Sequence, residues 1–393
     1  MEWKTSWSYL PINYNTIIGT VENITQRTFI KNNLNGKKIK VKFSNLYSKE
    51  SLILEKVVVG QKKSKNNDIE DSIYITYKGN KRIVIGAGEE FYSDELEWNI
   101  KYDAEIVISM YLKEKANIQS ACSTWRAKSW KTGYVLNGDY TMEQNVEYVK
   151  SEDIYPYVKA EVNKANIIFG ISEVNVFTDE KVTTIALFGD SITHMSYYSD
   201  ELIDLAYKKY PGKVTIINRG IGGNRLIHDA TFVDMPGKGK CFGEAGIKRF
   251  KKDIYSNYPP EVIIILEGVN DMMHPYLFNH PNEVVSVDVL KEGIKRLIET
   301  AHKMESKVYL GTVMPFRNDK QEFLLESEKV RVEYNEWIIN QRISEGVIDF
   351  SSVISDYKNL EYMKEGTHIG DGLHPNEKGG QEMAKLIPME WLK

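Results

Sequence analysis

Four apolar runs in the second half of the chain constrain its fold more than any other feature. They are as long as strands, they lack regular polar alternation, and they cover residues 183–188, 213–218, 261–266 and 307–313. Runs of this kind are typical of parallel strands that are buried on both faces. Segments with helical spacing lie between and after them, at 197–209, 243–257, 286–304, 327–344 and 376–387. This alternation predicts a doubly wound α/β domain whose site lies at the carboxyl ends of the strands.

The first half of the chain, to about residue 180, has a different rhythm. Ile39, Val41 and Phe43 alternate with lysines, which is the pattern of a half-buried strand, and similar short runs recur between turn residues. Closely spaced strands of this type predict an antiparallel β-sandwich or jelly roll. We expect residues 121–165 to be a long and mostly irregular excursion.

The change of rhythm predicts two domains, an all-β domain over 1–180 and an α/β domain over 181–393. A length of 393 residues agrees with this division, since domains average roughly 150 residues. The segment that joins them carries apolar residues such as Phe169, Val174 and Phe177 instead of the Gly, Ser and Pro of a flexible linker. We therefore predict that this segment packs as regular structure.

Composition excludes several classes of protein. With 51 Lys+Arg and 55 Asp+Glu, the net charge of 51 − 55 = −4 offers no general attraction for a nucleic acid. Cys122 and Cys241 are too few for a disulfide framework or a four-cysteine zinc site, and we expect free thiols. No apolar run approaches the roughly 18 residues of a membrane helix, and the first ten residues do not resemble a secretory signal. We expect a cytoplasmic protein, or a secreted one if a signal has been removed.

A tight turn with a serine, Gly189-Asp190-Ser191-Ile192-Thr193, directly follows the first apolar run. A serine on a strand-to-helix turn is held where its hydroxyl can attack a carbonyl carbon. Its own N–H, at the start of a helix, can face the oxyanion that forms. The alternative is that Asp190 or Ser191 only caps the helix, since both residue types are favoured caps.

A second candidate segment, Asp371-Gly372-Leu373-His374-Pro375, stands just before the last predicted helix. A serine nucleophile needs a base, and the base needs a carboxylate that orients it. With two residues between them, Asp371 and His374 can meet on one loop. Alone the pair indicates a surface turn, but together with the serine turn it favours a catalytic triad.

Glycine and asparagine follow the second and third apolar runs, in Asn218–Asn224 and Gly268–Asp271. A glycine lets its N–H approach a substrate closely, and an asparagine amide supplies a further donor, so these segments can form an oxyanion hole. The alternative is a phosphate-binding turn, but the glycines do not fit the dinucleotide or P-loop patterns.

These Ser, Gly, Asn and His blocks, in this order over about residues 183–388, resemble the SGNH (GDSL) hydrolase superfamily. GIGGNRLIHD at 220–229, RFKKDI at 249–254 and LEGVNDM at 266–272 are similar to one branch of putative carbohydrate esterases and arylesterases. In that branch an all-β domain precedes the hydrolase, and residues 25–60 and 83–112 resemble it. The resemblance implies a flavodoxin-like three-layer α/β/α domain behind a jelly-roll or β-sandwich domain.

By this resemblance Ser191 is the nucleophile, His374 the base and Asp371 the residue that orients the base. His368 is a second candidate base, but no carboxylate is spaced to orient it as well. The resemblance implies no metal and no organic cofactor.

The same resemblance implies an oxyanion hole formed by the N–H groups of Ser191 and Gly223 and the side chain of Asn270. We prefer Gly223 to Gly222 because the family's glycine directly precedes the polar residue of its second block, here Asn224.

We further predict that Asp190, His194 and Asn224 contact the substrate. The implied activity is that of a serine esterase for short acyl groups, acetyl esters of sugar hydroxyls above all. The expected partner is a small-molecule or oligosaccharide ester, with no nucleic acid and no membrane, while the oligomeric state stays open. Two alternatives remain: a carbohydrate-binding protein with an incidental hydrolase half, and an acyltransferase that uses the same triad.

Overall fold

The computed structural model describes residues 1–62, 68–155, 165–230, 242–318 and 325–393. They form two compact units, an N-terminal unit of Met1–Val182 with Tyr210–Ile217 and a C-terminal unit of Thr183–Lys209 with Asn218–Lys393. Within the described ranges every helix is too short or too polar to span a lipid bilayer. Each unit is described below by itself.

The stretch 210–217 is an exception to the single boundary that the sequence predicts. The side-chain amide of Asn33 donates to Tyr210 O and Val214 O, at 3.0 and 2.8 Å, and Thr215 Oγ1 donates to Thr5 O at 2.8 Å. These bonds group the stretch with the N-terminal unit, although the apolar run in which it lies was predicted for the α/β domain.

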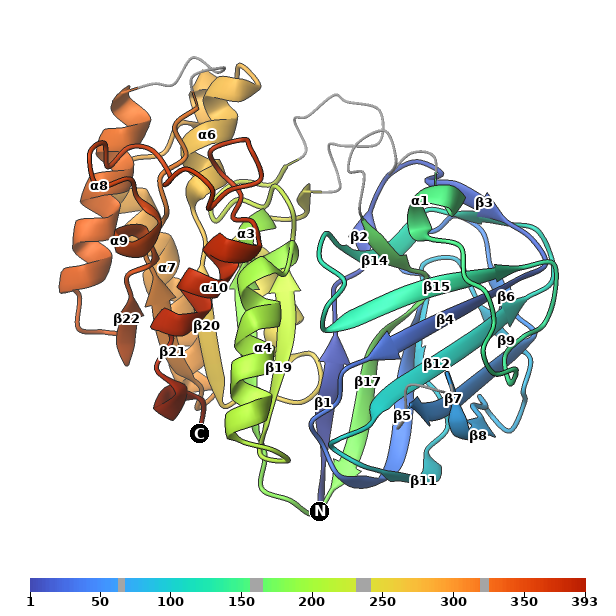
Figure 1. Cartoon of the computed structure of the whole chain (residues 1–393). Coiled ribbons are helices and arrows are strands. Elements are labelled where there is room, and N and C mark those ends of the chain that lie inside the picture. The colour runs from blue at the N-terminus through green and yellow to red at the C-terminus, as the bar shows by residue number, and fades with distance from the viewer. Residues whose placement is uncertain (63–67, 156–164, 231–241, 319–324) are drawn as a thin grey trace. The chain divides into compact units, whose positions relative to one another are not determined.

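The elements of the N-terminal unit are β1 (Glu2–Ser8), β2 (Ile12–Asn13), β3 (Gly19–Val21), β4 (Ile24–Ile30), β5 (Gly36–Ser44), β6 (Leu52–Leu54), β7 (Lys56–Lys62), β8 (Glu70–Tyr74), β9 (Ile83–Ile85), β10 (Glu90–Tyr92), β11 (Leu96–Ile100), β12 (Glu105–Leu112), β13 (Ala116–Ile118), β14 (Ser120–Thr124), β15 (Trp130–Leu136), α1 (Ser151–Ile154), β16 (Asn166–Ile168) and β17 (Gly170–Thr178). One five-stranded sheet has the order β1-β17-β5-β10, with β11 also on β5, and the other the order β15-β4-β12-β7-β8. All their pairings are antiparallel, and the two sheets lie one behind the other in Figure 1. The all-β prediction is confirmed, and a jelly-roll connection stays a prediction.

The period-two pattern of β5 determines which of its side chains enter the core. Ile39, Val41 and Phe43 are fully buried, while the lysines between them keep some exposure. Strand β17 lies between β1 and β5, so the prediction that the joining segment packs as structure is confirmed. Cys122 is buried and its thiol donates to Tyr9 O at 3.4 Å, and Cys241 lies outside the described residues.

The prediction of a mostly irregular excursion over 121–165 holds for most of the described residues but misses the strands β14 and β15 and the helix α1. Strand β15 pairs with β4 along its whole length, from Trp130 opposite Ile30 to Leu136 opposite Ile24, and α1 follows. The local sequence of β15 is interrupted by Gly133 and does not alternate cleanly. A partner about a hundred residues away in sequence therefore specifies this strand.

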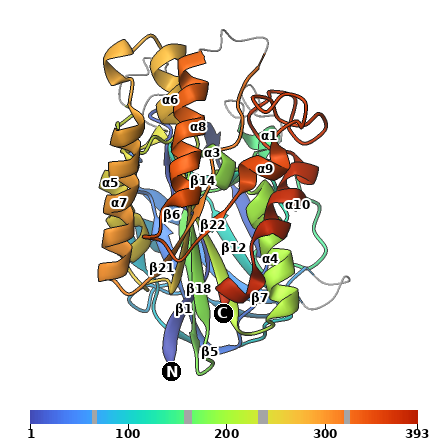
Figure 2. The same ribbon diagram turned by 90° about the vertical axis from the view of Figure 1, so that its left-hand side faces the viewer.

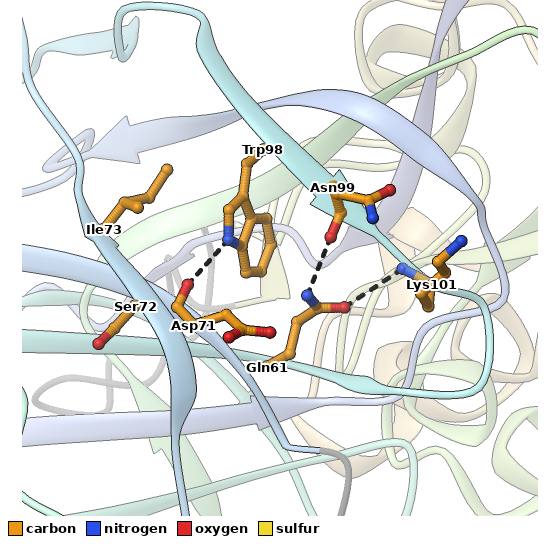
Figure 3. A pocket seen from close by; sticks show the side chains of 7 residues that line it. All are labelled: Gln61, Asp71, Ser72, Ile73, Trp98, Asn99 and Lys101. Atoms are coloured by element: carbon orange, nitrogen blue, oxygen red, sulfur yellow. Dashed lines mark hydrogen bonds between the residues drawn. The ribbon is translucent and has the colours of Figure 1, made fainter.

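The pocket in Figure 3 lies in the N-terminal unit, between β7, β8 and β11. The Trp98 indole N–H donates to Asp71 O at 2.9 Å, and the Gln61 side chain donates to Asn99 O and accepts from Lys101 N, at 2.9 and 3.2 Å. These bonds connect β11, of the first sheet, to β7 and β8, of the second.

The elements of the C-terminal unit are β18 (Thr183–Gly189), α3 (Ser191–His194), α4 (Tyr197–Lys209), β19 (Val214–Gly220), α5 (Gly246–Tyr255), β20 (Val262–Leu266), α6 (Val269–Leu277), the 3₁₀ turn η2 (Pro281–Glu283), α7 (Val287–Lys303), β21 (Lys307–Gly311), α8 (Leu325–Asn340), β22 (Gly346–Ile348), α9 (Phe350–Ile354), α10 (Glu377–Leu386) and the 3₁₀ turn η3 (Met389–Leu392). The predicted strands and helices are confirmed, with ends that differ by a few residues. Strand β22 and helices α6 and α9 were not predicted.

The sheet of this unit has the order β19-β18-β20-β21-β22, and β18, β20, β21 and β22 run parallel. In chain order this is 2-1-3-4-5, the flavodoxin-like arrangement. Figure 2 shows α5 and α7 on one side of the sheet and α4 and α10 on the other, which are the three predicted layers. The strand order reverses between β18 and β20, where such sheets place their ligands.

Candidate active site

Ser191 stands at the switch point of the sheet, immediately after β18. The carboxylate of Asp190 accepts a hydrogen bond from Ile192 N at 2.9 Å and so caps α3, which begins with Ser191. The cap and the nucleophile are thus neighbouring residues with separate roles, and the Ser191 hydroxyl is left for another partner.

That partner is His374, from the loop before α10. His374 Nε2 lies 2.8 Å from Ser191 Oγ, and His374 Nδ1 lies 2.6 Å from Asp371 Oδ2. The other oxygen of Asp371 accepts from Leu373 N and His374 N, at 3.0 Å each. Burial raises the pKa of Asp371, but its hydrogen bonds with His374 and with the backbone outweigh burial and lower it to about 2. Asp371 is therefore a carboxylate at neutral pH, as an orienting residue must be.

The loop of Asp371 and His374 is held by its own polar contacts. His368 Nδ1 accepts from Gly370 N and Gly372 N, both at 3.1 Å, so this histidine supports the loop and does not compete as base. Gly372 has φ +71°, and a Cβ there would lie 2.7 Å from Arg317 O, so the turn requires glycine.

The candidate oxyanion donors lie on the loops after β19 and β20. Asn270 is in the first turn of α6, and its Nδ2 donates to Asn224 O at 2.9 Å, while Ile221 N donates to Gly189 O at 3.0 Å. These two bonds connect the loops that carry Ser191, Gly223 and Asn270.

Gly223 occupies a conformation that few other residues adopt. Its φ is +74°, and a Cβ would overlap the ring of Phe242. The Gly223 N–H makes no hydrogen bond to any described residue, whereas the next N–H, of Asn224, donates to Ile221 O at 3.1 Å. Gly223 thus has a backbone donor left for a ligand, and so does Gly222, so the choice between the two stays a prediction.

Residues 187–381 match the model of the family described as the GDSL-like Lipase/Acylhydrolase family. The C-terminal unit is a GDSL hydrolase domain. The chain is accordingly a carboxylic ester hydrolase, as the sequence predicts.

Solved structures similar to the chain include members of the same family, and no curated protein matches it in sequence. A GDSL-like lipase from Bacteroides thetaiotaomicron has 18% identity and a TM-score of 0.38, over 53% of this chain and 87% of that one. An acetyl xylan esterase from Geobacillus stearothermophilus has 18% identity and a TM-score of 0.40, over 52% of this chain and 93% of that one.

Two of the three predicted substrate contacts in the GDSL domain are buried and hydrogen-bonded within the protein, and their contact with the substrate stays a prediction. Asn224 is fully buried; its amide donates to Phe242 O and Glu244 O, at 2.7 and 2.8 Å, and its oxygen accepts from Arg249 Nε at 2.7 Å. Its polar atoms are therefore already engaged within the protein, and it holds the glycine loop. Asp190 is 1% exposed and serves as the cap of α3.

His194, the third predicted contact, ends α3 and is buried. A Cβ on Gly222 would lie 3.4 Å from His194 Nδ1, which places the imidazole against the glycine loop. Contact with the substrate stays a prediction.

Buried carboxyl groups lie behind the catalytic loops of the GDSL domain. Burial raises the pKa of Asp190 to about 7 and that of Asp271 to about 6. Burial also raises the pKa of Glu267 well above its ordinary value, and the neighbouring Asp190 raises it further. Among the described residues, no three His, Cys, Asp or Glu side chains are grouped as ligands of a metal.

Sequence reasoning missed one residue that contacts several of these loops. Arg249, in α5, is 2% exposed and falls on the buried stripe of its helix with Gly246, Phe250 and Ile254. A charged residue at a core position of a helical pattern is the signal that could have found it.

Proposed function

We propose that this enzyme hydrolyses short acyl esters, acetyl esters of sugar hydroxyls in particular, through an acyl-enzyme intermediate on Ser191. The observation that carries the proposal is the continuous hydrogen-bonded series from Ser191 Oγ through His374 to Asp371, at 2.8 and 2.6 Å. These contacts are within the range in which a base can take a proton from a nucleophile.

In the first half-reaction Ser191 Oγ forms a bond to the ester carbonyl carbon while its proton moves to His374 Nε2. The negative charge on the carbonyl oxygen is stabilised by the N–H groups of Ser191 and Gly223 and by the amide of Asn270. The bond to the leaving oxygen then breaks, and His374 returns the proton to the alcohol.

In the second half-reaction water attacks the acyl carbon and gives a proton to His374. The tetrahedral intermediate collapses, the Ser191 Oγ–acyl bond breaks, and the proton returns to Ser191 as the carboxylic acid leaves. Asp371 keeps Nδ1 protonated throughout, so that Nε2 is free to accept.

The preference for acetylated sugars rests on the sequence resemblance to a branch of carbohydrate esterases. Hydrolysis rates of p-nitrophenyl acetate, butyrate and octanoate, and of acetylated xylo-oligosaccharides, test this preference. We expect acetyl esters to react fastest; faster hydrolysis of octanoate would refute it.

The substitution Ser191→Ala tests the mechanism itself. We expect kcat to fall by at least ~10³ without loss of the folded state, as is usual when one triad member is removed. Added alcohols separate hydrolysis from acyl transfer. If alkyl acetates form faster than acetate over a range of acceptor concentrations, the enzyme is an acyltransferase.

A second candidate function is carbohydrate binding by the N-terminal unit, which the pocket beside Trp98 favours. Its volume is ≈ 450 Å³, and Asp71, Asn99 and Lys101 supply polar groups around it (Figure 3). Sites of this size, with an aromatic side chain and a few polar groups, are typical for small ligands. Calorimetric titration with deacetylated xylo-oligosaccharides tests whether the pocket binds sugar. It compares the single variant Ser191→Ala with the double variant that also carries Asn99→Ala. Equal heats in both proteins would exclude the pocket.

A further inference from the structure

The guanidinium of Arg249 lies among the loops of the proposed oxyanion hole without belonging to the triad or to the hole. Arg249 is 2% exposed, and a buried charge is costly unless polar groups surround it. Asp253 supplies one partner, with an oxygen 3.0 Å from Nη1, and the guanidinium lies 4.0 Å from the centre of the Phe188 ring. Its remaining contacts point to the ends of three strands.

Each of those contacts reaches a residue close to one proposed oxyanion donor. Nη2 donates to Gly189 O at 2.9 Å, two residues before Ser191. Nε donates to Asn224 Oδ1 at 2.7 Å, and Asn224 directly follows Gly223.

The loop of the third donor is reached through a longer contact. Nη2 lies 3.6 Å from Glu267 Oε2, and Glu267 stands three residues before Asn270. A fourth contact, from Nη1 to Arg219 O at 3.0 Å, ties the guanidinium to the end of β19.

Only a guanidinium can make this set of contacts from one side chain. It has five N–H donors in a rigid planar fork, whereas a lysine ammonium has three donors around a single point. Lysine at this position keeps the charge but cannot reach Gly189 O, Asn224 Oδ1 and Arg219 O together.

We propose that Arg249 is a positioning residue that sets the relative places of the three oxyanion donors, and through them the rate of acylation. The proposal rests on the function proposed above, since it presupposes a reaction through an oxyanion. An oxyanion hole acts only when its donors lie within about 2.7–3.1 Å of the oxygen. Arg249 touches neither substrate nor reacting atoms.

The test compares Arg249→Lys with Arg331→Lys. Arg331, in α8, is a matched control because it is 3% exposed and donates to Glu328, Val313 O and Ser351 Oγ, none of which is a partner of Arg249. We expect kcat for p-nitrophenyl acetate to fall by about 10–10² in Arg249→Lys, with KM within about threefold, because small misplacements cost that much. Arg331→Lys should keep kcat within about twofold. Equal kcat values in the two variants would overturn the proposal.

A double-mutant cycle separates positioning from general damage. If Arg249 acts through the donors, adding Arg249→Lys to Asn270→Ala lowers kcat by clearly less than it does in the wild type. Independent, multiplicative losses would contradict the proposal. Rates are counted per active site with a fluorophosphonate titrant, so unfolded protein does not enter, and Arg249→Gln replaces Arg249→Lys if the latter does not fold.

The Ser191→Ala variant distinguishes failure of the proposed serine mechanism from failure of the proposed role of Arg249. Full activity in Ser191→Ala refutes the serine mechanism, whereas an inactive Ser191→Ala beside a fully active Arg249→Lys refutes only the role of Arg249.

Discussion

Each unit buries an arginine whose guanidinium bonds segments that are far apart in sequence. The two arginines differ in the kind of segment that they contact. Arg27, in β4, is fully buried and donates to Ser109 Oγ on β12, to Tyr148 Oη and to Tyr140 O, at 3.2, 3.0 and 2.5 Å. It fastens the connection after β15 to the face of an antiparallel sheet. Arg249 instead reaches the loops that follow three strands of the parallel sheet.

The difference comes from the direction of the strands. Parallel strands all end at one edge, so residues far apart in sequence converge there and one buried cation can organise them. Antiparallel strands end alternately at both edges. The buried cation on β4 accordingly fastens one connecting segment to its own sheet. We therefore expect substitutions in the two units to separate activity from stability.

The largest expected effect is that of Asp371→Asn. An amide cannot hold His374 in the required tautomer, so kcat should fall on the order of 10³–10⁴ while the fold remains. Steady-state kinetics with p-nitrophenyl acetate and circular dichroism measure this. Asp349→Asn is the control, since Asp349 caps α9 and an asparagine caps equally well. A loss below tenfold in Asp371→Asn would remove Asp371 from the triad.

The next effect is that of Asn270→Ala. The amide acts mainly in the transition state, so kcat should fall on the order of 10²–10³ with little change in KM. The control is Asn335→Ala, because Asn335 is also buried and exchanges hydrogen bonds with Val313 N and O, both at 2.8 Å. A change confined to KM would make Asn270 a substrate-binding residue.

In the N-terminal unit we expect a smaller effect, on stability and not on kcat. Arg27→Lys leaves buried carbonyls without a donor, so the free energy of unfolding should fall by about 2 kcal/mol with kcat within twofold. Denaturant titration measures the free energy of unfolding. Arg82→Lys is the control, because the half-exposed side chain of Arg82 pairs with Glu55 at 3.0 Å. A tenfold loss of kcat in Arg27→Lys would break the comparison between the units.

The last expected effect concerns the pH dependence of stability in the C-terminal unit. The pKa of Asp190 is raised by burial to about 7 from its ordinary 3.8, so the folded state retains a proton that the unfolded chain releases. The free energy of unfolding should therefore fall as pH rises from about 4 to about 7, at about 1.4 kcal/mol per pH unit and so by about 4 kcal/mol from this group. Urea midpoints at pH 5 and pH 7.5 should differ less in Asp190→Asn, which keeps the cap of α3. The same difference in both proteins would show that Asp190 does not titrate in this range.

Much of the site was predictable because its signals are local. The serine turn, the pair of Asp371 and His374, and the Gly and Asn blocks are each a few residues long and follow strands that the apolar runs identify. The sequence did not predict which partners single side chains bond. Nothing in the sequence near Asn224 shows that its amide faces Phe242 O and Glu244 O, about twenty residues later.

The sequence by itself thus determined the two kinds of unit, the strands and helices of the parallel sheet, and the residue types that can carry out ester hydrolysis. Periodicity and turn chemistry depend on neighbours in sequence, so they can be recognised without a fold. Only the tertiary structure decided that β15 pairs with β4, that residues 210–217 group with the N-terminal unit, and that Arg249 reaches three loops. These depend on contacts between residues far apart in the chain, where burial and hydrogen bonding override local preference.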